Sequence, residues 1–111
     1  METFDTKIVL HIPHSAFSAG GLVEIDYYGF CKALCERLNG NGITDWYETN
    51  AFGRYKGRRY DQELWTLFVR PDQKNVVLES FREMFSEWND VLQQEAFAYE
   101  LNGVLHVESA T

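Results

Sequence analysis

The stretch NVVLESFREMFSEWNDVLQ, residues 75–93, decides the fold, because its apolar residues recur with the period of an α-helix. They fall on one stripe of the helix surface, which is made of Val77, Phe81, Met84, Phe85, Trp88 and Leu92. A helix with a single apolar stripe buries that side against another layer of the protein. The stretch therefore predicts an amphipathic helix that lies against a partner layer.

An earlier segment, Leu22 to Leu38, follows the same pattern and predicts another helix, which is the first along the chain. Its stripe consists of Val23, Tyr27, Phe30, Cys31, Leu34 and Leu38. The sequence NGNG, residues 39–42, ends this helix, because glycine and asparagine favour helix C-termini. The preceding stretch SAFSAGG, residues 15–21, is predicted to be a loop.

Strand-like segments lie around the two helices. In KIVLHI, residues 7–12, the residues Ile8, Leu10 and Ile12 alternate with the others and are predicted to face inward, and Pro13 ends the strand. Segments 44–52 and 61–69 are joined by GRYKGRR, whose glycines indicate a bulge or a wide turn. Segments 96–101 and 104–109 flank Asn102-Gly103, a strong hairpin signal.

The resulting element order is β-α-β-β-α-β with an extra C-terminal hairpin strand, which is the order of a ferredoxin-like α+β fold. We expect a single domain, residues 1–111, with both helices on one face of an antiparallel sheet. The other face of the sheet, which includes Val9, would be open, and a homodimer could form through it.

Composition narrows the class of protein further. The 111 residues include 17 acidic and 10 basic residues, a net charge of -7, and 45% are hydrophobic, which excludes a disordered chain. No apolar run reaches the ~20 residues of a membrane span and no signal-peptide pattern is found, so we predict a cytoplasmic protein without membrane contact. Cys31 and Cys35 are predicted to be reduced structural thiols. Neither a Walker loop nor G-x-G-x-x-G occurs, and no cofactor is predicted.

The motif HIPHS, residues 11–15, raises the question of a metal site. Its IPH segment resembles the corresponding segment of the N-formylglutamate amidohydrolases, and this resemblance implies a zinc-dependent hydrolase with His14 as a ligand. Zinc needs three or four converging ligands, however, and His11 and His14 lie on opposite sides of the strand. His106 is predicted to face Tyr99 across the C-terminal hairpin. We therefore interpret the histidines as structural and predict no metal; the hydrolase is kept as an alternative.

A basic, aromatic cluster, FGRYKGRRY at residues 52–60, suggests a second alternative. Basic residues interleaved with aromatic rings can contact phosphates and stack on bases, and the basic residues here are Arg54, Lys56, Arg58 and Arg59. The signature of RNA-recognition domains is absent, and the acidic remainder of the chain would repel a polyanion. Nucleic-acid binding is therefore an alternative function, and nucleic acid is not the expected partner.

The most organised polar feature is an acidic stripe on the second predicted helix, formed by Glu79, Glu83, Glu87 and Asp90. Glu95 and Glu100 could extend this negative surface. In size and acidity the chain resembles small inhibitors carried by phages and mobile elements, including anti-CRISPR proteins that imitate nucleic acid. The resemblance implies a non-enzymatic binding or inhibitor protein. We predict that these six carboxylates dock on a basic, nucleic-acid-binding protein partner, and no catalytic residue is assigned.

Overall fold

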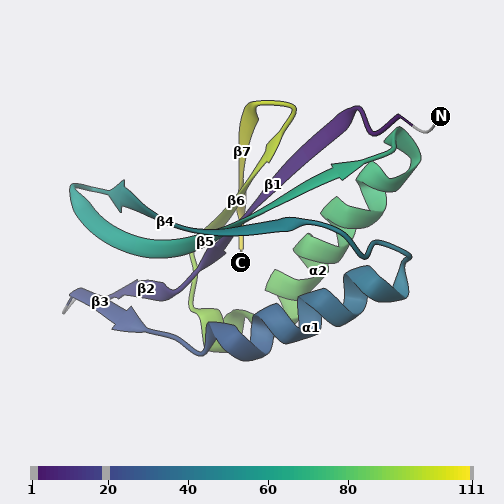
Figure 1. The fold of residues 1–111 in the computed structure, drawn as a ribbon. Helices are drawn as coiled ribbons and strands as arrows, with labels where there is room; N and C mark the ends of the chain where they lie inside the picture. The colour runs from purple at the N-terminus through teal and green to yellow at the C-terminus, as the bar shows by residue number, and fades with distance from the viewer. Residues whose placement is uncertain (1–2, 19–20, 111) are drawn as a thin grey trace.

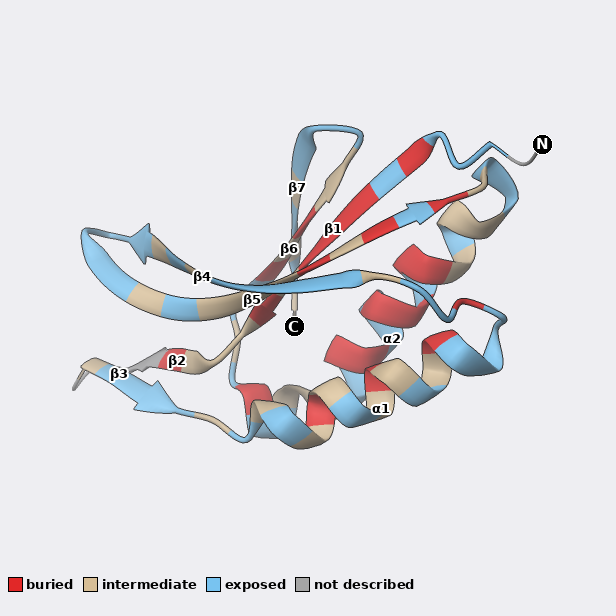
Figure 2. Cartoon of the chain, viewed as in Figure 1, coloured by how far each residue is buried: buried red, intermediate tan, exposed pale blue. Residues whose placement is uncertain are grey.

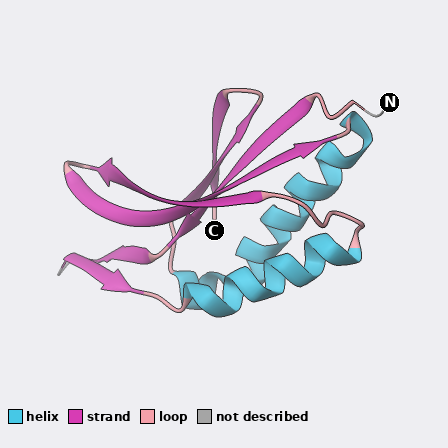
Figure 3. Ribbon diagram, viewed as in Figure 1, coloured by secondary structure: helices cyan, strands magenta, loops and turns pink. Residues whose placement is uncertain are grey.

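The computed structural model describes residues 3–18 and 21–110 (Figure 3). Its helices are α1 (Tyr27–Gly40) and α2 (Lys74–Leu92), and the short 3-10 helix η1 (Pro71–Gln73) leads into α2. Its strands are β1 (Thr6–Pro13), β2 (Ser15–Ser18), β3 (Gly21–Glu24), β4 (Tyr47–Tyr55), β5 (Arg58–Val69), β6 (Ala96–Leu101) and β7 (Val104–Ser109). None of the helices in these ranges is long and apolar enough to cross a membrane.

Five strands form an antiparallel sheet in the order β4-β5-β1-β6-β7, and β2 and β3 form a separate two-stranded sheet. Both long helices cover the same face of the larger sheet (Figure 1). The predicted α+β fold is confirmed, and the architecture is compatible with a ferredoxin-like arrangement that carries β7 as an additional edge strand.

The core lies between the sheet and the helices (Figure 2). Ile8, Leu10 and Ile12 of β1 are fully buried, as their alternation predicted. The stripe of α2 supplies an aromatic group in which Phe81 and Phe85 contact Phe97 of β6 and Phe30 of α1. The stripe that defined the second predicted helix is therefore the centre of the core.

The predicted start of the first helix is wrong. Residues 21–24 form β3, which pairs with β2, and the exposed Leu22 and Val23 belong to this hairpin. The helix begins later because the Asp26 side chain accepts a hydrogen bond from the Gly29 N–H at 3.4 Å and caps it there. The loop prediction for residues 15–21 is wrong for 15–18, which form β2; Ala19 and Gly20 lie outside the described residues.

The connection between β4 and β5 also differs from the prediction of a bulge or wide turn. Tyr55 pairs directly with Arg58, so only Lys56 and Gly57 form the turn, with φ values of 50° and 76°. Positive φ at both central positions matches the right-handed twist of the strands. Asn102 and Gly103 adopt the same form, with φ of 49° and 84°, and confirm the predicted hairpin.

Candidate functional site

His14 lies at the bend between β1 and β2, where three segments meet. Its backbone N–H donates to the Asp61 carbonyl of β5 at 3.4 Å, and its carbonyl accepts from the Ile25 N–H at 3.3 Å. Pro13 ends β1 just before this bend. The main-chain bonds therefore fix the histidine between β5 and the segment that leads into α1.

The imidazole of His14 is held by a ring and faces a carboxylate. It stacks on the Tyr27 ring, with 3.8 Å between the centroids and 12° between the planes. Its Nε2 lies 3.6 Å from Glu63 Oε1 and is buried without a hydrogen-bond partner. A buried polar atom without a partner costs free energy, which makes His14 a candidate functional residue.

Glu63 is anchored through its other oxygen. Its Oε2 accepts from Trp65 Nε1 at 3.2 Å and from the Cys31 thiol at 3.6 Å. Burial, together with the negative charge of Glu63, raises the pKa of Cys31 to about 12. The thiol therefore stays protonated at neutral pH and acts as a donor to Glu63. Cys31 and Cys35 are both free, as the sequence predicted.

A cavity of about 660 Å³ opens beside His14, lined by residues of β3, of β5 and of the segment that leads into α1. Its charged side chains are Glu24, Arg59 and Asp61, and its aromatic and aliphatic walls include Leu22, Ile25, Tyr27 and Tyr60. The Arg59 guanidinium stacks on the Phe52 ring at 3.7 Å, and no described carboxylate forms a salt bridge with it. The cavity therefore presents a positive group and negative groups to the same space.

The two histidines of HIPHS diverge, as predicted. His11 Nε2 lies 2.9 Å from Glu100 on the sheet face opposite the helices, whereas His14 faces Glu63. Within residues 3–18 and 21–110, no group of three or more His, Cys, Asp or Glu side chains could hold a metal ion.

The six predicted partner-binding carboxylates do not share one surface. Arg37 of α1 pairs with Glu83 at 3.5 Å and with Glu87 at 2.6 Å. The other carboxylates of the stripe, Glu79 and Asp90, are exposed on α2, whereas Glu95 precedes β6 and Glu100 pairs with His11. Their assignment as partner contacts stays a prediction.

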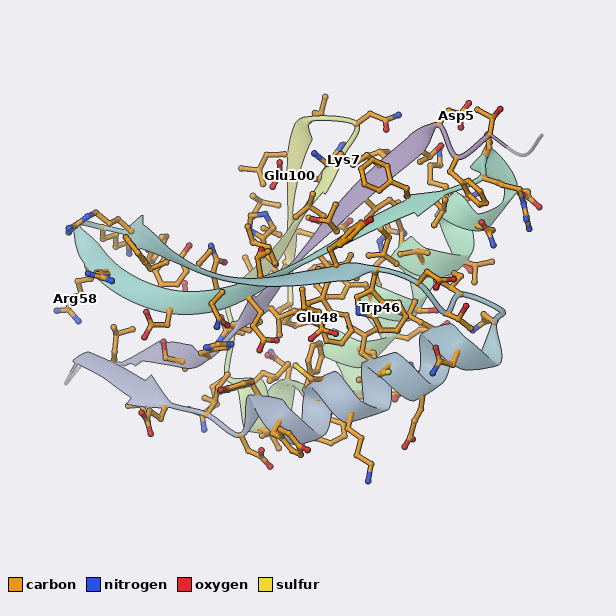
Figure 4. The ribbon with its side chains drawn as sticks, in the orientation of Figure 1. Asp5, Lys7, Trp46, Glu48, Arg58 and Glu100 are labelled. Atoms are coloured by element: carbon orange, nitrogen blue, oxygen red, sulfur yellow. The ribbon has the colours of Figure 1, made fainter. Side chains whose placement is uncertain are left out.

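The basic residues Arg54, Lys56, Arg58 and Arg59 lie at the tip of the β4–β5 hairpin, where Figure 4 shows Arg58 pointing away from the molecule. Arg59 is the member of this set that lines the cavity. Two of the others make local contacts: Arg54 donates to the Gly57 carbonyl at 3.4 Å, and the Lys56 amine lies 5.3 Å from the centre of the Tyr55 ring.

Sequence reasoning did not select Tyr27, Asp61 or Glu63 as site residues. A signal for Glu63 was present, because it has the same parity along β5 as the buried residues Trp65, Leu67 and Val69. An acid on the buried side of a strand needs a partner, and this makes it a candidate functional residue.

A second polar cluster joins α2 to the C-terminal hairpin, away from the cavity. Glu108 accepts from Arg82 Nε at 2.9 Å and from the Tyr99 hydroxyl at 2.6 Å. Two hydrogen bonds lower the pKa of Glu108 below its usual 4.5. The bond from Arg82 has the larger effect and the bond from Tyr99 the smaller. His106 stacks on Tyr99 with 5.1 Å between the ring centroids, which confirms the predicted cross-strand pair.

This cluster should make stability depend on pH. Because the pKa of Glu108 is lower in the folded chain, its contribution is present above pH 4.5 and is lost as the pH falls through the folded value. Glu108→Gln should therefore reduce the free energy of unfolding by about 1 kcal/mol at pH 7, and the difference from wild type should shrink in acid. Urea unfolding from pH 7 to pH 3 measures this. Glu79→Gln, at an exposed position of α2, should show no such trend, and a pH-independent effect of Glu108→Gln would contradict the expectation.

Comparison with models of protein families finds no match, and comparison with curated proteins finds none either. The fold itself is shared with solved structures of a phage SAM lyase. The lyase in its apo state superposes with a TM-score of 0.62 at 14% identity, over 98% of this chain and 94% of the other. The lyase in complex with S-methyl-5'-thioadenosine gives a TM-score of 0.60 at 9% identity, over 94% of this chain and 88% of the other.

These neighbours contradict the predicted function. We predicted a non-enzymatic, anti-CRISPR-like inhibitor, whereas both structures that share the fold over nearly the whole chain are of an enzyme. The geometry gives a physical reason for the error. Arg37 partly neutralises the acidic stripe. The cavity beside the unpaired His14 nitrogen is lined by residues of β3, β5, the His14 bend and the start of α1, and none of these residues belongs to the acidic stripe.

Proposed function

We propose that this chain is a phage-type enzyme that cleaves S-adenosylmethionine (SAM) in the cavity beside His14. One observation carries the proposal: two structures that share the fold over at least 94% of this chain are of a phage SAM lyase, and one of them contains S-methyl-5'-thioadenosine. The chemistry of the cavity supports it independently.

The reaction can be written from its substrate and the thioadenosine product. The sulfonium of SAM carries a methyl group, the 5' carbon of adenosine and the γ carbon of the amino-acid chain. S-Methyl-5'-thioadenosine keeps the first two, so the bond from sulfur to the γ carbon breaks and its electron pair goes to sulfur. In a lyase reaction no water is added, and the carboxylate of the substrate can attack the γ carbon to close a cyclic ester. The charges of sulfonium and carboxylate cancel, and no proton is needed from the protein.

The cavity offers complementary groups for such a substrate. Its volume of about 660 Å³ falls in the ~300–1,000 Å³ range of small-molecule sites. Glu24 and Asp61 favour a cation, and the faces of aromatic rings such as Tyr27 attract one as well. Arg59 is free of carboxylate partners in the described chain and is suited to the substrate carboxylate.

His14 lines this cavity, and Glu63 lies next to His14. His14 Nε2 faces Glu63 Oε1 at 3.6 Å, and this pair can bond to a hydroxyl or amine of the substrate when the two side chains move apart. Trp65 and Cys31 hold the far oxygen of Glu63, so the carboxylate is oriented before a ligand arrives.

The proposal is tested by incubating the purified chain with SAM and following the products by liquid chromatography and mass spectrometry. We expect S-methyl-5'-thioadenosine to accumulate in step with SAM loss. S-Adenosylhomocysteine, which has a neutral thioether in place of the sulfonium, should remain intact because its sulfur is a poor leaving group. If SAM persists and calorimetry detects no binding of SAM, the proposal fails.

A further inference from the structure

The two oxygens of the Glu63 carboxylate have different surroundings. Oε2 accepts hydrogen bonds from two donors, the Trp65 Nε1–H at 3.2 Å and the Cys31 thiol at 3.6 Å. Oε1 lies 3.6 Å from His14 Nε2. Because both donors bind the same oxygen, they determine which oxygen of the carboxylate is turned toward the histidine.

The two donors hold the carboxylate from different elements. Trp65 belongs to β5, like Glu63 itself, whereas Cys31 belongs to α1. Tyr27, whose ring stacks on His14, is the first residue of the same helix and lies one helical turn before Cys31. Side chains one turn apart lie on the same side of a helix. One side of α1 therefore holds both members of the pair, the imidazole through a ring contact and the carboxylate through a hydrogen bond.

The Cys31 thiol acts as a donor at every pH near neutrality. Burial, followed in effect by the negative charge of Glu63, raises the pKa of Cys31 to about 12, so the thiol keeps its proton. The thiolate is the nucleophilic form of cysteine, and a protonated, half-buried thiol is a weak nucleophile. The contact between the thiol and the carboxylate therefore serves the geometry of the pair and not a chemical step at sulfur.

We propose that Cys31 is a positioning residue for the site beside His14. The thiol holds Glu63 Oε2, keeps Oε1 turned toward the imidazole and sets the place of the pair relative to α1. The inference rests on the proposed function, because His14 lines the cavity assigned to SAM. A displacement of the pair by a fraction of an ångström weakens its bonds to a bound substrate.

The test compares alanine substitutions at the two cysteines. Cys31→Ala removes the thiol donor to Glu63 and introduces a residue that favours helix. Cys35→Ala is the matched control, because Cys35 lies one turn further along α1, is also half-buried and packs against the same core. Calorimetry with SAM should show a dissociation constant about 3- to 10-fold larger for Cys31→Ala, the effect of about one hydrogen bond, and an unchanged constant for Cys35→Ala.

A double substitution separates positioning from packing. In a Glu63→Ala background, Cys31→Ala should cause no further loss of affinity, because the thiol acts through the carboxylate. A further loss in that background, or equal losses in the two single cysteine variants, would assign the effect to helix packing and overturn the proposal. Unweakened SAM binding by Cys31→Ala would overturn it as well and would leave the proposed function intact.

The hydrogen bond can also be observed without SAM. In the Cys35→Ala chain, Cys31 carries the only S–H group, because the sequence has two cysteines and both are free. We expect Glu63→Ala to move the S–H stretching band in the Raman spectrum to higher frequency, since the thiol loses its acceptor; an unmoved band would overturn the positioning role. If the wild-type chain binds no SAM although the band moves, the proposed function fails, and the role of Cys31 in SAM binding fails with it.

Discussion

Replacing Phe81 by alanine is expected to lower the free energy of unfolding by about 3–5 kcal/mol. The Phe81 side chain is fully buried, and its ring packs edge-on against Phe85 of the same helix at 5.0 Å and against Phe97 of β6 at 5.7 Å. It also contacts Phe30 of α1 at 6.5 Å. One side chain thus joins both helices to the sheet, and its removal leaves a cavity that rigid aromatic neighbours cannot fill.

Urea unfolding followed by circular dichroism measures this effect. Domains of this size have a total stability of about 5–15 kcal/mol, so the variant should be partly or largely unfolded near 37 °C. Val91→Ala is the control, because Val91 lies on the same helix and is 40% exposed; its effect should stay within about 0.5 kcal/mol. A loss below 1 kcal/mol for Phe81→Ala would show that the core repacks around the missing ring.

The fold could be predicted where the periodic signal and the burial coincide. The stripe from Val77 to Leu92 has the period of a helix, and α2 buries the stripe as predicted, apart from the half-buried Trp88. Val23 extended the stripe of the first predicted helix by coincidence of spacing, although it lies in the exposed β3 strand. A local pattern cannot distinguish a buried helical stripe from an apolar residue in an exposed strand. The β2–β3 hairpin is set by pairing between strands, and the start of α1 is set by the Asp26 cap.

The candidate site could be predicted only in part, because it depends on strand register. His14 and Glu63 meet because β1 and β5 pair with Ile12 opposite Glu63, a register that joins residues far apart in sequence. The HIPHS motif indicated His14 as a candidate. Glu63 could have been identified as well, because it lies on the same side of β5 as the buried residue Trp65. The charge of α2 misled the functional prediction, because the ion pairs of Arg37 with Glu83 and Glu87 connect two helices and leave no local signal.

Replacing His14 or Glu63 by glutamine is expected to weaken SAM binding, and with it SAM cleavage, by about 10- to 100-fold, which is the loss of one hydrogen bond or ionic contact in a partly buried site. His14→Gln removes the ring that stacks on Tyr27 together with its buried Nε2. Glu63→Gln removes the charge near His14, and its amide oxygen can still accept from Trp65 and Cys31, so the fold should be retained.

A double-mutant cycle separates a shared role from two independent ones. If His14 and Glu63 act together on the substrate, the double variant should lose little more affinity than either single variant, because the first substitution already disables the pair. His106→Gln and Glu95→Gln are matched controls outside the cavity and should bind SAM as wild type does in calorimetry. Additive losses would mean that the two residues contribute separately. Unchanged binding in both single variants, with SAM still cleaved, would place the site elsewhere on the chain while leaving the proposed reaction intact.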